Sequence, residues 1–133
     1  MDNKPKILLV DDDLIVLTNL AAYLEDEGYS VFKALNAEDA LGLIEKLSDS
    51  DSGVNEHMIA IVDIRLPGIN GNELIKKCLQ ITTDTKFIIH TGSTNYEMPP
   101  EFESSPAISN NIFRKPIYNM HDYVMEIERL IKE

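Results

Sequence analysis

The sequence has 133 residues, of which 44% are hydrophobic and 26% are charged, as expected for one ordinary globular domain. Its net charge of -11, from 23 acidic and 12 basic residues, argues against direct binding to nucleic acid or to an acidic membrane surface. The single cysteine, Cys78, excludes an internal disulfide and a cysteine-rich metal site.

The first half of the chain predicts two strands, each followed by a helix. These elements cover residues 6–10 (strand), 14–27 (helix), 29–34 (strand) and 37–47 (helix). Asp13 and Asn36 are suited to cap the two helices, because their side chains accept hydrogen bonds from the free N–H groups of a first turn. The apolar residues of the first helix that should face the core are Leu14, Leu17, Ala21 and Leu24.

The second half continues the alternation but weakens toward its end. After a polar loop over 48–56, strands are predicted over 58–63, 86–90 and 108–113, and helices over 72–81 and 120–132. Pro99 and Pro100 interrupt the stretch 95–105, which has no apolar stripe, so only one short helical turn is expected there. His90 lies on an apolar strand and is expected to be a hydrogen-bonded interior residue.

The stretch from Met58 to Gly68 is the most informative part of the sequence. Five apolar residues end in Asp63, and Pro67-Gly68 turns the chain soon afterwards. Such a run predicts a strand that is buried on both faces, with Asp63 at its carboxyl end and facing solvent.

Five strands alternating with five helical segments predict an α/β fold. Right-handed βαβ connections would give a parallel sheet with helices on both faces, although the pattern does not fix the strand order. Polar residues directly follow four of the strands, namely Asp11 with Asp12, then Asp63, Thr91 and Lys115. Because the carboxyl ends of parallel strands share one edge, we expect these side chains to converge.

The converging residues form a set that can handle a phosphoryl group. Three carboxylates repel one another and need a cation, and oxygen ligands of this kind suit Mg²⁺. With the ammonium of Lys115 and the hydroxyl of Thr91, the set could stabilise phosphoryl transfer to Asp63 as nucleophile. Singly, each residue also has a structural explanation: capping for Asp11 and Asp12, turn chemistry for Asp63 and Thr91, and a strand exit for Lys115.

Four sequence blocks resemble the signature of response regulator receiver domains. The blocks, in the family's order, are ILLVDDD at 7–13, IVDIRLPGING at 61–71, IHTG at 89–92 and FRKP at 113–116. The likeness runs from about residue 5 to 132, so residues 1–133 are interpreted as a single receiver domain. It implies a flavodoxin-like, doubly wound sheet of five parallel strands in the order 2-1-3-4-5, here with a short or irregular fourth helix.

The resemblance also implies a role in a two-component phosphorelay. Asp63 would be phosphorylated by transfer from a phosphohistidine of a sensor histidine kinase or phosphotransfer protein, with Thr91 and Lys115 contacting the phosphoryl oxygens. Phosphorylation would then switch a surface, built from the fourth helix, fifth strand and fifth helix, that binds a downstream protein. Self-catalysed phosphorylation and dephosphorylation are the only chemistry expected, so the domain is not predicted to be an enzyme.

A magnesium site is the second implication of the resemblance. Asp11, Asp12 and Asp63 would bind Mg²⁺ together with the backbone carbonyl of Arg65. The N-terminus carries no secretory apolar segment and no run reaches membrane-spanning length, so we expect a cytoplasmic domain that is not membrane-bound.

The sequence departs from the family in the part that transmits the signal. Ile112 stands where the family usually has Tyr or Phe, and Phe113 next to it should face the other side of its strand. The region around Pro99-Pro100 replaces an ordinary fourth helix. Our hypothesis is that the output surface is mobile or reshaped and serves a different partner.

Three alternatives remain open at this stage. A haloacid-dehalogenase-like phosphatase would use the motif Asp-x-Asp-x-Thr/Val, which residues 11–15 nearly match. The fifth position of the motif is Ile15, however, the chain has no room for a cap, and no late acidic pair follows the lysine. A receiver-like domain that is never phosphorylated is disfavoured by the intact site residues. The chain could also be the receiver part of a larger hybrid kinase or transcription regulator.

Overall fold

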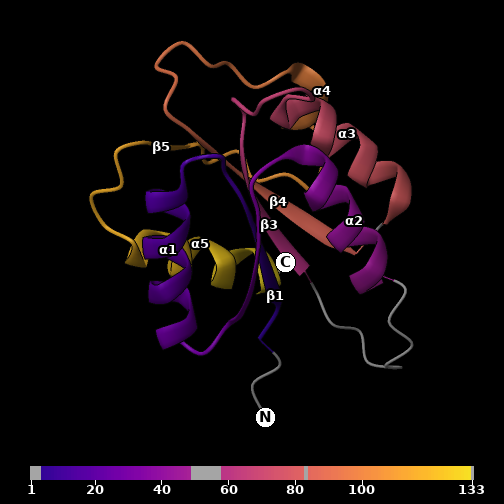
Figure 1. The fold of residues 1–133 in the computed structure, drawn as a ribbon. Helices are drawn as coiled ribbons and strands as arrows, with labels where there is room; N and C mark the ends of the chain where they lie inside the picture. The colour runs from indigo at the N-terminus through magenta and orange to yellow at the C-terminus, as the bar shows by residue number, and fades with distance from the viewer. Residues whose placement is uncertain (1–3, 49–57, 83, 133) are drawn as a thin grey trace.

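In the computed structural model, which describes residues 4–48, 58–82 and 84–132, strands and helices alternate along the chain (Figure 1). The strands are β1 (Lys6–Val10), β2 (Ser30–Ala34), β3 (Met58–Asp63), β4 (Thr85–Thr91) and β5 (Phe113–Arg114). The helices are α1 (Leu14–Asp26), α2 (Ala37–Ser48), α3 (Gly71–Ile81), α4 (Pro100–Glu103) and α5 (His121–Lys132). The loop predicted over 48–56 lies outside the described residues from 49 onward.

The five strands form one parallel sheet in the order β2-β1-β3-β4-β5, which confirms the predicted order 2-1-3-4-5. The register pairs Val10 of β1 with Val62 of β3, and Val62 with Ile89 of β4. These three residues each stand one or two positions before a polar strand end. The register therefore brings those strand ends to one edge of the sheet.

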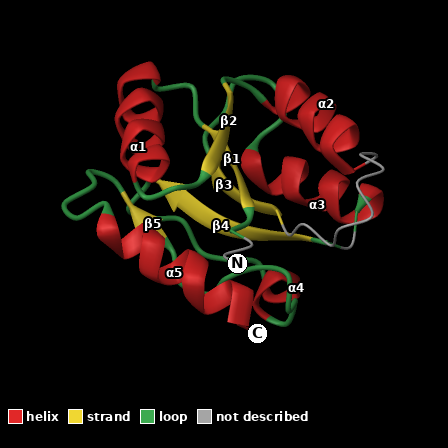
Figure 2. Ribbon diagram, turned by 90° about the horizontal axis from the view of Figure 1, so that it is seen from below, coloured by secondary structure: helices red, strands yellow, loops and turns green. Residues whose placement is uncertain are grey.

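A hydrophobic core lies on each face of the sheet (Figures 1 and 2). Helices α1 and α5 cover one face, and α2, α3 and the short α4 cover the other. Strand β3 contributes to both cores, with Ile59 and Ile61 facing α1 and α5, and Ala60 and Val62 facing α2 and α3. All six of its residues are buried, as predicted for a strand covered on both faces.

The helix starts follow the predicted capping chemistry. The carboxylate of Asp13 accepts hydrogen bonds from the backbone N–H groups of Ile15 and Val16, and Asn36 accepts from Asp39 N–H. The prediction for Leu14 was wrong, because this side chain is 62% exposed. Leu14 is the first residue of α1, one turn ahead of the buried stripe that begins at Leu17 and ends at Leu24.

The last strand is shorter than predicted. Only Phe113 and Arg114 pair with β4, and Ile108 makes one isolated bridge to Phe87. Between them, the hydroxyl of Ser109 accepts a hydrogen bond from the N–H of Asn111. Such local side-chain bonds compete with a regular ladder, so the predicted strand over 108–113 is broken.

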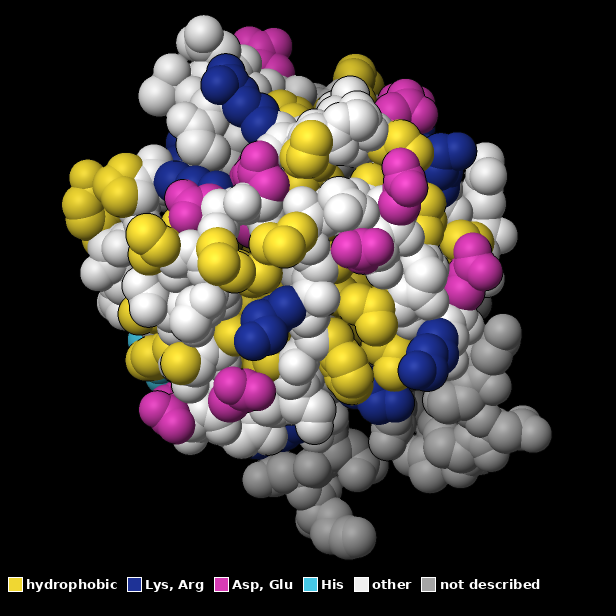
Figure 3. Space-filling model, viewed as in Figure 1, with side chains coloured by type: hydrophobic (Ala, Val, Ile, Leu, Met, Phe, Trp, Pro, Cys, Tyr) yellow, Lys and Arg dark blue, Asp and Glu magenta, His cyan; other side chains and the backbone are white. Residues whose placement is uncertain are grey.

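Helix α4 has four residues and begins after Pro99, as the two prolines predicted. Its Phe102 is buried against the core shared with α2 and α3. Among the described residues, no helix is both long and apolar enough to cross a membrane. Acidic, basic and apolar side chains are interspersed over the face that Figure 3 shows.

Candidate functional site

The carboxyl edge of the sheet brings three aspartates together. Carboxylate oxygens of Asp11, Asp12 and Asp63 all lie within 4.8 Å of one another. Asp12 is exposed, whereas Asp11 and Asp63 are each only 3% exposed. The expectation that Asp63 faces solvent was therefore wrong, because the Lys115 side chain and the turn after β3 enclose its carboxylate.

Both oxygens of Asp63 accept hydrogen bonds. The backbone N–H of Arg65 donates to Oδ1 at 3.1 Å, and the ammonium of Lys115 donates to Oδ2 at 3.0 Å. The turn itself closes where the N–H of Gly71 donates to the carbonyl of Ile64 at 2.9 Å. This turn fixes the direction in which the Asp63 side chain leaves β3.

Lys115 joins two of the aspartates. Its Nζ lies 2.8 Å from Asp11 Oδ2 and 3.0 Å from Asp63 Oδ2. The backbone of Lys115 is tied to β4, because its N–H donates to the carbonyl of Thr91 at 2.8 Å. The lysine thus lies where it neutralises part of the acidic cluster.

Thr91 ends β4 with its side chain fully buried. Its hydroxyl oxygen accepts a hydrogen bond from the backbone N–H of Ser93 at 3.0 Å, which leaves the hydroxyl proton free to be donated elsewhere. The residue directly before Thr91 on β4 is His90, which pairs in register with Asp63 of β3.

Charge and burial act against each other in this site. Burial alone would raise the pKa of Asp11, but contacts with His90, with Lys115 and with the N–H of Asp13 outweigh it and lower the pKa to about 2. For Asp63, burial is the stronger effect and raises the pKa, in spite of Lys115 and Arg65. Burial would lower the pKa of Lys115, yet the two carboxylates raise it.

The site has the donors that a hard divalent cation needs. Three carboxylates supply oxygen ligands, and Asp11 Oδ2 is buried without a hydrogen-bond partner of good geometry among the described residues, although Lys115 and His90 are near it. Three clustered carboxylates with one lysine to balance them fit a bound cation. The side chain of Arg65 is exposed, and the role of its backbone carbonyl as a ligand stays a prediction.

The cluster opens onto a hollow between the turn after β3 and the loop after β4. It has a volume of about 730 Å³, and its lining includes Asp12, Arg65, Asn72, Asn95 and Tyr96. The hydroxyl of Tyr96 donates to the side-chain carbonyl of Asn72 at 2.9 Å across it. A group that approaches Asp12 from solvent can enter here.

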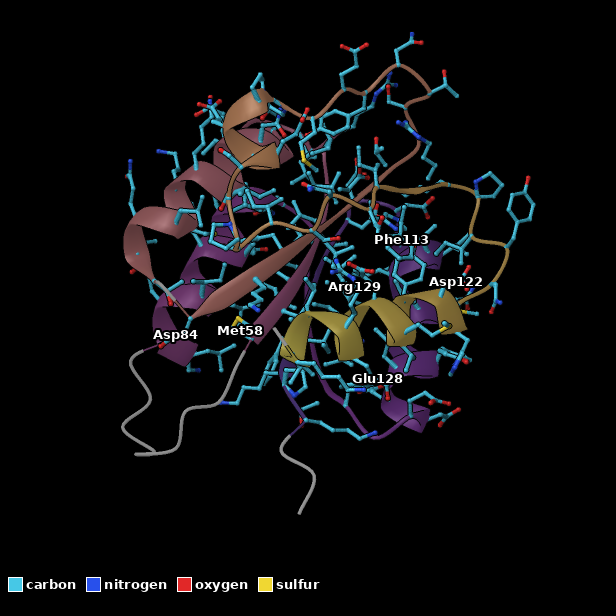
Figure 4. The ribbon with its side chains drawn as sticks, turned by 180° about the vertical axis from the view of Figure 1, so that it is seen from behind. Met58, Asp84, Phe113, Asp122, Glu128 and Arg129 are labelled. Atoms are coloured by element: carbon cyan, nitrogen blue, oxygen red, sulfur yellow. The ribbon has the colours of Figure 1, made fainter. Side chains whose placement is uncertain are left out.

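Ile112, directly before β5, and Phe113, its first residue, face opposite cores, as the alternation predicted. Ile112 packs against the core that includes α2 and α3, and Phe113 packs against the core that includes α1 and α5. The ring of Phe113 lies 4.4 Å, centroid to centroid, from that of Tyr123, over the N-terminal part of α5 in Figure 4.

The predicted interior position of His90 is confirmed, but its contacts with Asp11 and Tyr123 were not predicted. Its Nε2 lies 3.3 Å from Asp11 Oδ2, and its Nδ1 is hydrogen-bonded to the hydroxyl of Tyr123 on α5. A signal was present, because a polar residue directly before Thr91 on an apolar strand must find a polar partner. The sequence alone gave no reason to choose Asp11 as that partner.

Comparisons with known proteins point to one family. The family model of the response regulator receiver domain matches residues 7–120. Transcriptional regulatory protein AruR of Pseudomonas aeruginosa is 36% identical over 88 residues, which are 66% of this chain and 34% of AruR. Sporulation initiation phosphotransferase F of Bacillus subtilis is 29% identical over 111 residues, 84% of this chain and 82% of that protein. This chain therefore spans about a third of AruR but most of the phosphotransferase.

Solved structures share the fold over nearly the whole chain. A CheY-like response regulator receiver domain protein from Methanospirillum hungatei gives a TM-score of 0.75 at 32% identity, over 96% of this chain and 94% of the other. Response regulator protein TrrA from Thermotoga maritima, solved in complex with Mg²⁺ and BeF, gives 0.72 at 25% identity, over 95% and 98%.

Proposed function

We propose, from the premise that this chain belongs to the response regulator receiver domain family, that it accepts a phosphoryl group on the carboxylate of Asp63. The observation that carries the proposal is the contact set of this carboxylate. Asp63 ends β3 at the carboxyl edge of the sheet, where it lies close to two further aspartates and accepts a hydrogen bond from Lys115. Only at this place do the described residues bring three such carboxylates together.

The transfer forms one bond and breaks one. An oxygen of Asp63 attacks the phosphorus of a phosphohistidine, the P–N bond breaks, and the histidine nitrogen leaves with the electron pair and takes up a proton. The product is an acyl phosphate on Asp63. Lys115 would move its contact from the carboxylate to a phosphoryl oxygen, and the free hydroxyl proton of Thr91 would be donated to another.

Asp11, Asp12 and Asp63, with the backbone carbonyl of Arg65, would hold Mg²⁺ in this site. When bound, the ion would neutralise the negative charge that the carboxylates and the phosphoryl group bring together. The convergence of the three carboxylates and the complex of the related TrrA with Mg²⁺ and BeF support this assignment.

The phosphodonor we propose is a sensor histidine kinase or a phosphotransfer protein, and the output is an altered surface for a downstream protein. Sporulation initiation phosphotransferase F, which the chain matches along most of its length, supports a phosphorelay. The shorter match to AruR leaves open a place as the receiver part of a longer regulator. A cytoplasmic location and the absence of enzymatic turnover stay predictions.

The central test is phosphorylation with Mg²⁺ and acetyl phosphate, followed by intact-mass measurement. The wild type should gain the mass of one phosphoryl group, and Asp63→Asn should gain none, because an amide cannot form the acyl phosphate. Chelation of Mg²⁺ should also abolish the adduct. An adduct that persists in Asp63→Asn would overturn the proposal, and steady turnover of a simple phosphomonoester would favour the phosphatase alternative.

A further inference from the structure

A buried histidine connects the acidic cluster to α5. His90, 2% exposed, lies in β4 between Asp11 at the end of β1 and Tyr123 on α5. Among the described residues, the two buried side-chain polar atoms without a hydrogen bond are Asp11 Oδ2 and His90 Nε2. They are 3.3 Å apart, so Asp11 Oδ2 lies between the ammonium of Lys115, 2.8 Å away, and the ring of His90.

The neighbours of His90 assign the roles of its two nitrogens. A carboxylate can only accept, so Nε2, which faces Asp11, carries a proton that it can donate. In a neutral ring, Nδ1 then accepts a hydrogen bond from the hydroxyl of Tyr123. The ring is thus held from one side by α5 while its other side presents a donor to the aspartate.

Tyr123 ties this contact to the helix. Its side chain is 2% exposed, and its ring stacks at a tilt on Phe113 with centroids 4.4 Å apart. Strand β5 and helix α5 therefore meet at the side chain whose hydroxyl contacts His90. A displacement of the Asp11 carboxylate would therefore be transmitted to α5 through the side chains of His90 and Tyr123.

We propose that His90 is a positioning residue that orients the metal ligand Asp11 and couples it to α5 through Tyr123. The inference rests on the proposed Mg²⁺ site. It adds a polar connection from this site to α5, on the opposite face of the sheet from Ile112. Ile112 stands where the family usually has an aromatic residue. Outer partners of metal ligands fix the direction of the ligand oxygens, and their loss weakens metal binding.

Two substitutions of His90 separate its two contacts. Gln carries an amide nitrogen at about the distance of Nε2, and so keeps a donor toward Asp11. Asn reaches only about as far as Nδ1, and so keeps a partner for Tyr123 but loses that donor. His90→Asn should raise the Kd for Mg²⁺ by roughly tenfold or more, whereas His90→Gln should recover most of the loss.

The measurement is a titration with MgCl₂ followed by backbone amide shifts in NMR spectra. In the wild type, Mg²⁺ should shift the amides of Val124 and Ile127 on α5 as well as those of the site. Tyr123→Phe removes one hydroxyl oxygen and should reduce the α5 shifts while the site shifts remain. This variant keeps the inference testable if His90→Asn does not fold.

A second histidine–tyrosine pair provides the control. His121 Nδ1 and the Tyr23 hydroxyl lie 3.1 Å apart on the surface between α5 and α1, and neither contacts an aspartate of the site. Tyr23→Phe should therefore leave Mg²⁺ affinity unchanged.

Equal Mg²⁺ affinity in His90→Asn and wild type would overturn the inference, as would equal weakening by Gln and Asn, which would indicate a packing role. Unaltered α5 shifts in Tyr123→Phe would overturn the coupling. Failure of the wild type to bind Mg²⁺ is a distinct result, because it would overturn the metal site of the proposed function itself.

Discussion

The two halves of the sheet are held by different kinds of interaction. At β1 and β3, continuous parallel ladders of five or six residue pairs position Asp11 and Asp63, and a backbone hydrogen bond closes the turn after β3. Beyond β4, the ladder shrinks to two pairs, and α4 has four residues. There, side chains replace the missing backbone pairs.

Two sets of side-chain bonds hold this second region. The guanidinium of Arg114 donates to the carbonyls of Ser93 (2.7 Å) and Tyr96 (3.2 Å), which tethers the loop after β4. The buried carboxylate of Glu126 on α5 accepts from the side chains of Ser109 and Asn111 in the broken strand.

Backbone pairing therefore holds the aspartates of the site, whereas individual side-chain bonds hold the region after β4. A ladder position cannot be lost by one side-chain change, whereas each side-chain tether can. The aspartates should therefore tolerate little backbone change, and the region after β4 should respond to single polar substitutions by local opening. Substitutions at Gly71, Glu126 and Arg114 test this contrast.

Gly71→Ala should be the most damaging of the three. A Cβ at this position would lie 2.4 Å from the carbonyl oxygen of Asp63 and 2.7 Å from Cα of Ile64, and both are backbone atoms that cannot rotate away. We expect a loss of about 3 kcal/mol in the free energy of unfolding, the upper part of the usual cost of overpacking, and a displaced Asp63. Urea unfolding and the rate of phosphorylation by acetyl phosphate measure the two effects.

Gly42 on α2 is the matched control, since a Cβ there would meet no atom within 4 Å. Gly42→Ala should stabilise the protein by roughly 0.5–1 kcal/mol, because alanine loses less conformational freedom in a helix. If Gly71→Ala were as stable as the wild type and phosphorylated at the same rate, the turn after β3 would not be the rigid element described above.

Most of the ladder-held half could be predicted from the sequence. The period of two in the strands, the caps Asp13 and Asn36 and the polar strand ends follow from local chemistry, and the parallel edge then brings Asp11 and Asp63 together. The burial of Asp63 could not be predicted, since it depends on where the distant Lys115 side chain points.

The second region shows why the rest escaped prediction. Residues 108–113 contain enough apolar side chains to suggest a strand, yet Ser109 and Asn111 bond to Glu126, which is 15 or more positions away along the chain. A similar long-range contact joins His90 to Asp11. Local propensity contains no information about partners that only the folded chain brings near.

Glu126→Gln should have an intermediate effect. Loss of the charge weakens the hydrogen bonds from Ser109 and Asn111, and the free energy of unfolding at pH 7 should fall by about 2 kcal/mol. Arg129 bonds to the same carboxylate, but its side chain is partly exposed, so it should contribute little to this fall in the free energy of unfolding. Amide hydrogen exchange should become faster across residues 108–112.

The pH dependence of this variant gives a second measurement. Burial would raise the pKa of Glu126, but bonds from Arg129, Ser109 and Asn111 outweigh it and lower the pKa below the ordinary 4.5. A carboxyl with a lowered folded-state pKa stabilises the fold above the unfolded-state pKa and loses this contribution as pH falls through the folded-state pKa. The stability difference between wild type and Glu126→Gln should thus narrow below about pH 4.5.

Glu128 on the same helix is the control for charge alone. It is exposed, and Figure 4 places it on the side of α5 opposite to Arg129. Glu128→Gln should change the free energy of unfolding by less than about 0.5 kcal/mol, as surface substitutions usually do. A difference between wild type and Glu126→Gln that stays constant down to pH 3 would show that packing, and not the charge, holds the broken strand.

Arg114→Lys should have the smallest global effect and the most local one. Lysine keeps the positive charge but lacks the fork that reaches the carbonyls of Ser93 and Tyr96 together. We expect the loop after β4 to open more easily by roughly 0.5–1 kcal/mol, the worth of an ordinary hydrogen bond, with the global free energy of unfolding almost unchanged. Faster amide exchange at residues 93–97, but not in β3, is the expected readout.

Lys76→Ala, which removes the exposed ion pair with Glu101, should leave that exchange as it is. Because Arg114 ends β5 directly before Lys115, its tether links the loop that follows Thr91 to the backbone next to this lysine. Wild-type exchange in Arg114→Lys would mean that backbone contacts hold this loop as well, and the contrast between the two regions would disappear there.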